Sequence, residues 1–358
     1  ESAYDTKIRI LQSADDIPDV FYSENNSHVK ELLDNSDVIP IEKYLNELDF
    51  WNIVIPSAKV KGYRNQIYAV PFDGLSYEVI QYNVDIFKKN KISVPTTADQ
   101  LKHIVEVLNA NKITPIAIGA KDGYPAAMMM EGFAYSMDPE ITKNIAAKKA
   151  KFSDKPYKIA ATKVKELLDI NAFEKDAQNI SDEDAFNLYC EGKAAMYFGT
   201  SNNFEEADTK LKGKNAIMYY PVLDTSLKQN YAKYCAGGVK PDSGLFIDAS
   251  SKHPLDAVKL AVEMSKFYSI YLYEEKNDPN IIFNESALKL NQNNKIELSV
   301  INFMSNVTSF ETSNGLIQDI MPNTDAAKSI NESSAEFMKG YISVDDYLRG
   351  MDMVVEDK

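Results

Sequence analysis

The chain has 358 residues, which is enough for two domains or for one large domain with a substantial hydrophobic core. Its formal net charge of −14 argues against a nucleic-acid partner, because phosphate contacts need clustered Lys and Arg. No stretch approaches the roughly 18 consecutive apolar residues that a membrane-spanning helix needs. The two cysteines, Cys190 and Cys235, form no CxxC motif, so no zinc or thioredoxin-like site is predicted. They are either two small apolar residues or a disulfide pair.

Predicted helices alternate with short apolar strands along the chain. Thr96 and Asp99 form a capping box at the start of a helix, and residues 113–119 follow as a buried strand. The same order recurs where the helical stretch DEDAFNLYCEG precedes the strand KAAMYFG. Further on, the strand GLFID precedes a helix with Pro254 near its first turn. This alternation predicts an α/β architecture with largely parallel sheets.

Residues 68–87, YAVPFDGLSYEVIQYNVDIF, form one long extended run with no helical period before about Asp85. A strand of that length can leave one domain and enter another. Several motifs in and beyond this run match one family in order along the chain. They include DIPDVFYS near the start, GKAAMYFGTS in the middle, GYISVDDYLRGM near the end, and the residues Tyr68, Pro71, Tyr82, Asn83, Asp85, Phe87, Pro95 and Thr96. The chain resembles the carbohydrate-type, family 1 extracellular solute-binding proteins of ABC importers, which are related to maltose-binding protein.

The resemblance implies a two-lobed, type II periplasmic-binding-protein-like fold, with hinge-connected lobes and central, mostly parallel sheets. We expect a first lobe of residues 1–80 with 245–298 and a second lobe of residues 84–240 with 302–358. In the family, the Pro-Asp-Val strand follows a strand, a helix and another strand, whereas only ESAYDTKIRILQSADD precedes it here. The first lobe is therefore expected to lack its N-terminal βα unit.

The loop that follows the strand KAAMYFG carries four uncharged polar residues, Thr200, Ser201, Asn202 and Asn203. In open α/β sheets ligands bind beyond the carboxyl ends of strands, so these groups are candidates for hydrogen bonds to ligand hydroxyls. The alternative is that Ser201 or Asn203 only caps the next helix. The family often has a sugar-stacking Trp where this chain has Asn202, so stacking is expected from Tyr124 or Tyr234 instead.

Other candidate ligand-binding residues come from three further loops. In VPFDG, Asp73 could accept hydrogen bonds from two hydroxyls, or Asp-Gly could simply form a turn. Gly237 and Gly238 permit close backbone approach. The full additional set is Phe72, Asp73, Tyr77, Asp122, Tyr124, Tyr234, Gly237, Gly238 and Asp242.

No metal or other cofactor is predicted. Tyr219 and Tyr220 are adjacent, so their side chains point to opposite faces of a strand, and no carboxylate or His motif accompanies them. The resemblance implies capture of a carbohydrate in the cleft between the lobes for delivery to a membrane ABC permease. It also implies a monomer located outside the cell membrane or in the periplasm, as a lipid-anchored lipoprotein. The alternative is a secreted glycoside hydrolase or another carbohydrate-active enzyme with a pair of cleft carboxylates.

Overall fold

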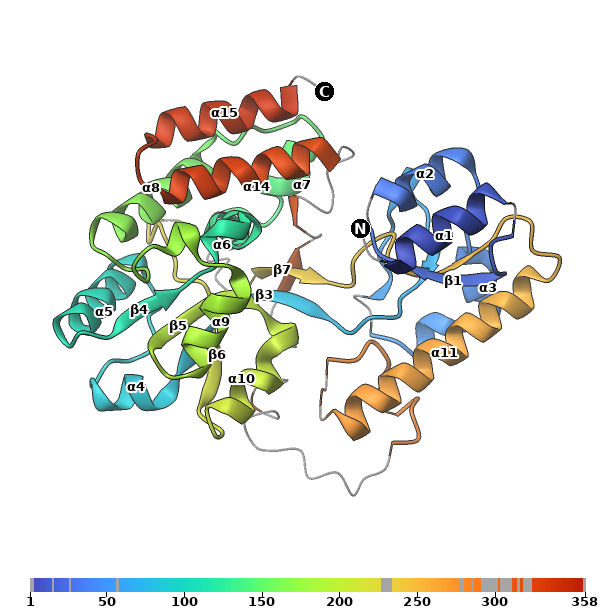
Figure 1. The fold of residues 1–358 in the computed structure, drawn as a ribbon, viewed down its shortest axis with the longest axis horizontal. Coiled ribbons are helices and arrows are strands. Elements are labelled where there is room, and N and C mark those ends of the chain that lie inside the picture. The colour runs from blue at the N-terminus through green and yellow to red at the C-terminus, as the bar shows by residue number, and fades with distance from the viewer. Residues whose placement is uncertain are drawn as a thin grey trace. The chain divides into compact units, whose positions relative to one another are not determined.

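The computed structural model describes residues 3–14, 16–25, 27–55, 58–226, 234–276, 278, 280–284, 286–290, 302, 311–313, 316–317 and 324–356. The chain forms two compact units, each assembled from two separate stretches (Figure 1). Unit 1 comprises residues 1–75 and 238–295, and unit 2 comprises residues 76–237 and 296–358. The long extended run of residues 68–87 crosses the first boundary between the units, which lies between residues 75 and 76. Strand β3 (Ser76–Asn83) begins directly after this boundary.

Unit 1 is built on a three-stranded sheet in the order β1-β8-β2, formed by Val20–Ser23, Gly244–Ile247 and Ala69–Val70. Both neighbours of β8 run antiparallel to it, with Phe21 opposite Phe246 on one side. Helix α11 (Pro254–Glu275) packs against all three strands, and Pro254 occupies its first turn as expected. The other helices of this unit are α1 (Ala3–Ser13), α2 (Ser27–Asn35), α3 (Glu42–Glu47), η1 (Phe50–Asn52) and η3 (Tyr63–Asn65).

Unit 2 contains a six-stranded sheet in the order β4-β5-β3-β7-β9, with β6 also paired to β3. The strands are β3, β4 (Thr114–Ala117), β5 (Ala194–Thr200), β6 (Asn215–Met218), β7 (Tyr234–Gly238) and β9 (Glu311–Ser313). Six of the seven residues of β5 are buried, because helices contact it from α6 (Tyr124–Tyr135) and from α9 (Asp182–Cys190). The remaining helices described are α4 (Val84–Lys89), α5 (Ala98–Ala110), α7 (Ile141–Ala146), α8 (Lys155–Asp169), α10 (Phe204–Lys210), α14 (Thr324–Met338) and α15 (Val344–Glu356), with short turns η4 (Ala120–Asp122), η5 (Ala177–Asn179) and η6 (Ser201–Asn203).

The α/β class is confirmed, but the expectation of mostly parallel sheets is wrong for the ladders described. Parallel pairing joins β4 to β5 and β7 to β9, whereas β3 runs antiparallel to both β5 and β6. The reason is the discontinuous assembly of each unit. Strands such as β3 and β8 come directly after the chain crosses from one unit to the other. They pair with strands from another stretch of the chain, and those strands run in the opposite direction.

Two local expectations are refined by the structure. The segment before β1 is helix α1, which begins at Ala3. The helix start near residue 97 is shifted by one residue, since Thr97 is the N-cap and its hydroxyl accepts from the Gln100 backbone N–H at 3.3 Å. The carboxamide of Gln100 in turn accepts from the Thr96 N–H at 2.7 Å, so Gln100 plays the part expected of Asp99.

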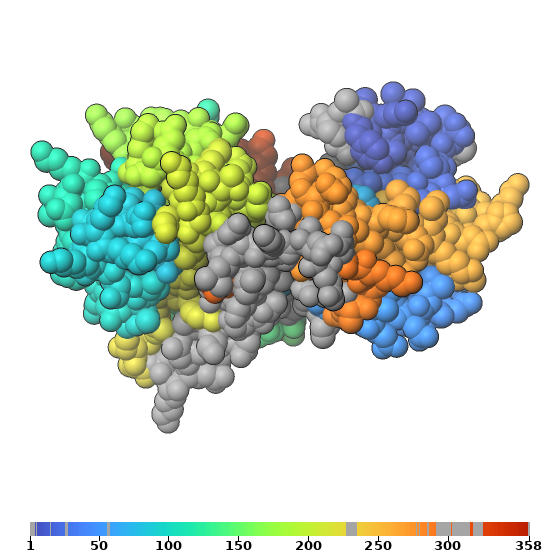
Figure 2. Space-filling view, turned by 90° about the horizontal axis from the view of Figure 1, so that it is seen from below, coloured from blue at the N-terminus to red at the C-terminus, as the bar shows by residue number. Residues whose placement is uncertain are grey.

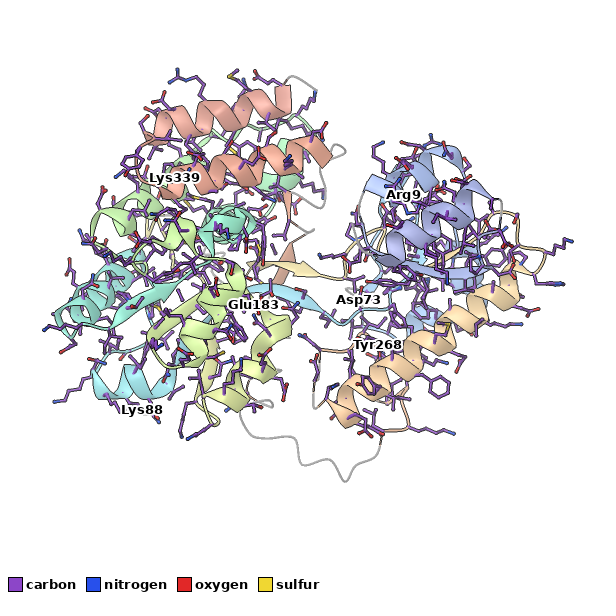
Figure 3. All side chains as sticks on the ribbon, in the orientation of Figure 1. Arg9, Asp73, Lys88, Glu183, Tyr268 and Lys339 are labelled. Carbon is purple, nitrogen blue, oxygen red and sulfur yellow. The ribbon has the colours of Figure 1, made fainter. Side chains whose placement is uncertain are left out.

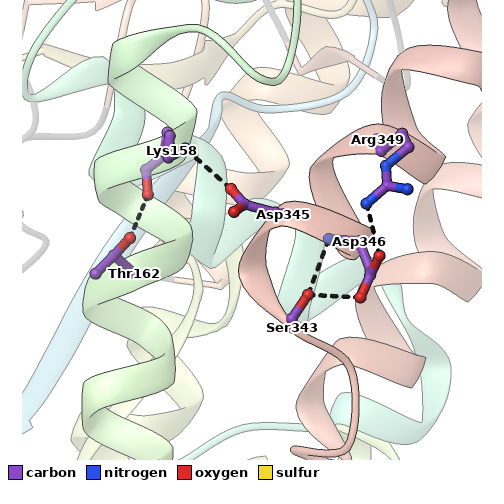
Figure 4. Close-up of polar contacts among 6 residues, drawn as sticks. All are labelled: Lys158, Thr162, Ser343, Asp345, Asp346 and Arg349. Atoms are coloured by element: carbon purple, nitrogen blue, oxygen red, sulfur yellow. Dashed lines mark hydrogen bonds and ion pairs between the residues drawn. The ribbon is translucent and has the colours of Figure 1, made fainter.

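Helix α15 begins with a well-formed cap and is tied to α8 (Figure 4). The Ser343 hydroxyl accepts from the Asp346 N–H at 3.1 Å and donates to the Asp346 carboxylate at 2.6 Å. Asp345 forms a 2.9 Å ion pair with Lys158 of α8. The interior contact between these helices is apolar, with Tyr347 and Met351 buried in the same core cluster as Tyr157 and Val164. These charges are exposed, so burial of the apolar face is the larger stabilising effect.

Candidate functional site

The polar loop after β5 is divided between interior and exposed residues. Ser201 is 1% exposed, and its hydroxyl accepts from the Tyr77 backbone N–H at 3.0 Å. Tyr77 is itself only 4% exposed. Asn202 is exposed, and its carboxamide oxygen accepts from the Thr200 hydroxyl. Of these residues, Thr200, Asn202 and Asn203 therefore reach the surface, while Ser201 and Tyr77 hold the loop against β3.

A second group in unit 2 is centred on Asp182, which sequence reasoning did not single out. Its carboxylate accepts from the Tyr124 hydroxyl at 2.6 Å and from the Tyr197 hydroxyl at 2.9 Å. Its backbone N–H donates to the Asp122 carboxylate at 2.7 Å. Partial burial raises the pKa of Asp182, and the two tyrosine hydrogen bonds oppose that rise. The predicted residues Asp122 and Tyr124 are thus brought together at the start of α9, with the Tyr124 ring 39% exposed.

Unit 1 carries a comparable group of tyrosine and carboxylate side chains around Asp73, which is labelled in Figure 3 with Tyr268. The Tyr22 hydroxyl donates to Asp73 Oδ2 at 2.7 Å. Phe72 stacks on Tyr268 of α11, with ring centroids 4.6 Å apart and planes 12° apart. Partial burial raises the pKa of Asp73, an effect that the Tyr22 hydrogen bond opposes. Asp73 is therefore an exposed hydrogen-bond acceptor beside a stacked aromatic pair.

Asp242 lies in unit 1 with a different role. Its Oδ2 accepts from the Tyr63 backbone N–H at 2.7 Å, while its buried Oδ1 has no hydrogen-bond partner among the described residues. Burial raises the pKa of this carboxyl to about 6. A cavity of about 10 Å³, which is enough for roughly one water molecule, is lined by Asp242 and Pro71 among others. Asp242 therefore belongs to the interior of unit 1.

The glycine pair acts through the backbone. Gly237 has φ +120°, and a Cβ there would lie 2.1 Å from the Ser76 carbonyl oxygen. Gly238 has φ +106°. β7 and β3 can approach this closely only because residue 237 has no side chain. The backbone of Tyr234 starts β7, but its side chain lies outside the described part of the structure.

The residues that sequence reasoning missed are Tyr22, Tyr268, Asp182 and Tyr197. Tyr197 lies two residues before Gly199 and the polar loop, and Asp182 follows Ser181 at the start of a predicted helix, so both carried a local signal. Tertiary contacts between distant segments decide the others.

A broad hollow of about 450 Å³ lies elsewhere on unit 2, beside β4. It is lined by Lys112, Thr114, Asn171 and Glu174 among others, and by none of the predicted site residues. Burial raises the pKa of Glu174 to about 7, although the carboxyl accepts from the Ile118 N–H. The site predicted from the sequence is thus separate from this hollow.

The described residues offer neither a metal site nor a membrane-spanning helix. No group of three or more His, Cys, Asp or Glu side chains is placed to hold a metal ion there. Within the same residues, no helix is both long and apolar enough to cross a membrane. Cys190 and Cys235 are both buried and unbonded, so the disulfide alternative is wrong and both serve as small apolar residues.

A family model described as "Bacterial extracellular solute-binding protein" matches residues 1–266, about three quarters of the chain. The chain belongs to this family. The resemblance read from the sequence motifs is therefore confirmed, and the two compact units are those of a solute-binding protein. The family description gives its members a solute-binding role outside the cell.

Solved structures of similar proteins cover nearly the whole solute-binding chain. One, from work on xylan utilization by the thermophilic bacterium Caldanaerobius polysaccharolyticus, has 25% identity and a TM-score of 0.80, covering 98% of this chain and 88% of that one. A chitin oligosaccharide binding protein has 17% identity and a TM-score of 0.79, covering 98% and 86%. A sugar transporter protein from Bacillus licheniformis, in complex with stachyose, has 17% identity and a TM-score of 0.68, covering 98% and 88%.

Among curated proteins, an uncharacterized ABC transporter extracellular-binding protein of Pyrococcus horikoshii is 29% identical over 126 residues. The match covers 35% of this chain and 29% of that protein. The aligned part thus spans less than a third of the curated relative.

Proposed function

We propose that this solute-binding protein captures a carbohydrate and delivers it to a membrane ABC permease. The observation that carries the proposal is the family match over residues 1–266. Similar structures described with xylan, chitin oligosaccharides and stachyose support a carbohydrate as the ligand class. The ligand-facing groups described above suit such a ligand, since sugars present hydroxyl donors to carboxylates and flat C–H faces to aromatic rings.

The proposed ligand-binding groups of each unit include neighbouring carboxylates, which carry negative charge. In unit 1, burial raises the pKa of Asp73, and the nearby negative charge of Glu24 adds to that rise. Asp122 likewise contributes to the raised pKa of Asp182 in unit 2. A carboxylate ligand would add a like charge to either group, which is unfavourable. The proposed ligand is therefore an uncharged oligosaccharide or a related polar solute.

The remaining parts of the proposal concern the whole protein. We propose that the two units act as the lobes of a hinged receptor, with residues 1–75 and 238–295 in one and residues 76–237 and 296–358 in the other. Hinge closure on ligand would supply the difference that a permease recognises. The protein is proposed to act as a monomer, lipid-anchored at the outer face of the membrane, and to have no enzymatic activity.

A thermal-shift screen tests the ligand class. The panel contains xylotriose, N,N′-diacetylchitobiose, raffinose and stachyose, with sodium glutamate as a polar non-sugar control. A ligand that binds only the folded state raises Tm, and at 100 times Kd it adds about 2.7 kcal/mol to the free energy of unfolding. We expect at least one sugar to raise Tm. Chromatography after long incubation should show that the concentration of this sugar has not changed. Shortened products would favour a glycoside hydrolase, and a shift with glutamate alone would overturn the carbohydrate assignment.

A further inference from the structure

A line of buried amide side chains runs beneath the polar loop of residues 200–203. Gln81, on β3, is fully buried, and Asn215, at the start of β6, is 4% exposed. Asn203 lies above them and is partly exposed. Buried amides are retained where their donors and acceptors are both satisfied. The orientation of each amide therefore follows from the groups around it.

The orientation of the amide groups is fixed at Asn215. The Tyr189 hydroxyl donates to Asn215 Oδ1 at 2.6 Å. Asn215 Nδ2 lies 3.2 Å from the backbone carbonyl of Phe204, a group that can only accept. Nδ2 also donates to Gln81 Oε1 at 2.6 Å. The oxygen of Gln81 is thereby fixed toward Asn215.

The orientation of the Gln81 amide then fixes which of its atoms faces the loop. Because its oxygen faces Asn215, its Nε2 faces the loop and donates to the Thr200 carbonyl at 3.1 Å. The same Nε2 donates to Asn203 Oδ1 at 2.7 Å. Both hydrogens of Gln81 are then used, and the oxygen of Asn203 is occupied by the protein. Asn203 is left with its NH₂ group directed away from Gln81, where Nδ2 lies 3.5 Å from the Tyr197 hydroxyl.

We infer that Gln81 is a positioning residue that makes Asn203 a hydrogen-bond donor to the ligand. An Asn free to rotate its amide could offer either a donor or an acceptor, whereas this one presents N–H. The ligand group that meets it must therefore be an acceptor, such as a hydroxyl or ring oxygen of a sugar. The inference rests on the proposed function, because it assigns a polarity to the same carbohydrate site.

The first test is a double-mutant cycle of Gln81→Leu and Asn203→Ala, measured by isothermal titration with the panel sugar that gives the largest thermal shift. Asn203→Ala should weaken binding about tenfold, and Gln81→Leu by about three- to tenfold. The double variant should bind no more weakly than Asn203→Ala alone, since Gln81 acts through Asn203. The control is Asn202→Ala, a loop neighbour whose side chain accepts from Thr200 and not from Gln81, and its effect should simply add to that of Gln81→Leu.

Additive effects of Gln81→Leu and Asn203→Ala would overturn the inference, as would a lowered Tm for Gln81→Leu with unchanged affinity. Gln81→Glu provides a second variant if Gln81→Leu does not fold. An ionised Glu keeps the size of Gln but offers Asn203 only an acceptor, so it should weaken binding as Asn203→Ala does.

A ligand-free measurement separates this inference from the proposed function. In ¹⁵N-labelled protein, the side-chain NH₂ protons of Gln81 should exchange slowly with solvent, and those of Asn203 faster. Gln81→Leu should move the Asn203 side-chain signals more than those of Asn202. Equal movement of both pairs would contradict the positioning role. If no panel sugar binds, the carbohydrate assignment fails, and these spectra still decide the orientation of Asn203.

Discussion

The Tyr22 hydroxyl donates a 2.7 Å hydrogen bond to Asp73 Oδ2 across 51 residues of sequence. This contact ties β1 to the loop after β2 and holds one oxygen of the carboxylate. It also opposes the burial that raises the pKa of Asp73. The result is a carboxylate with a fixed direction beside the stacked rings of Phe72 and Tyr268.

Tyr22→Phe should therefore change both the affinity and its pH dependence. Loss of the hydrogen bond leaves Asp73 less well oriented, which we expect to weaken sugar binding about three- to tenfold. It also removes an influence that lowers the pKa of Asp73, so that pKa rises further. Affinity that depends on the carboxylate is lost as pH falls through this pKa, and in the variant the loss should begin at a higher pH. Titration calorimetry from pH 4 to 7 measures it, and an unshifted profile would contradict the role of Tyr22.

The carboxylates of the site should discriminate against acidic sugars. A neutral sugar and the uronic acid with the same ring stereochemistry differ only at one carbon, so their comparison isolates charge. We expect the uronic acid to bind at least tenfold more weakly than the neutral sugar at pH 7. This difference should shrink as ionic strength rises, because salt screens the repulsion between solvent-exposed charges. Asp73→Asn should reduce the difference between the two ligands. Equal affinities in the unaltered protein would exclude this electrostatic selection.

The buried carboxyl of Asp242 should make stability depend on pH. Its pKa is about 6 in the folded state and 3.8 in the unfolded reference, so the folded state binds the proton more tightly. Its contribution to the free energy of unfolding is fully present below about pH 4 and is lost as pH rises through 6, up to about 3 kcal/mol in all. Asp242→Asn can still accept from the Tyr63 N–H and should flatten that part of the profile.

Urea denaturation at pH 4, 5, 6 and 7 measures the change. Asp34→Asn is a control of opposite sign, because a hydrogen bond from Lys30 lowers the pKa of Asp34. Its contribution is present above its unfolded pKa and lost as pH falls. An Asp242→Asn profile as steep as that of the unaltered protein between pH 4 and 6 would show that this carboxyl is not responsible.

Gly237→Ala should destabilise the protein strongly. The new Cβ would lie 2.1 Å from the Ser76 carbonyl oxygen and 2.7 Å from Tyr77 Cα, so β7 and β3 would have to separate. Gly213→Ala is a matched control, since Gly213 also has positive φ but its Cβ would meet nothing within 4 Å. We expect about 1 kcal/mol for Gly213→Ala and several times more for Gly237→Ala. Equal losses in thermal unfolding would mean that backbone strain, rather than the contact with β3, explains the glycine.

Helix α11 exposes a row of large apolar side chains on the surface of unit 1, where its residues appear gold to orange (Figure 2). The row consists of Leu260, Met264, Phe267 and Tyr271, at helical spacing. The flanking charges pair locally, as in the Lys259–Asp256 and Lys266–Glu263 ion pairs. Phe267 is 70% exposed. The spacing of apolar residues along this helix therefore does not by itself show which of its faces is buried.

The sequence by itself determined the family and the kinds of local structure. Motif order along the chain identified a solute-binding protein, and hydrophobic periodicity placed helices such as α5 and strands such as β5. These features are local, because a cap, a helical stripe or a buried strand needs only nearby residues. The sequence also placed polar groups at the loop after β5, where Asn202 and Asn203 reach the surface.

Only the tertiary structure decided strand direction and hydrogen-bond polarity. The antiparallel pairing of β8 with β1 and β2 depends on segments more than 170 residues apart, which no local pattern encodes. The same holds for Tyr22 with Asp73, for Tyr124 with Asp182, and for Gln81 with Asn203. A hydrogen bond is directional and acts over about 3 Å, so the partner of each polar group is fixed only when the fold brings the two together.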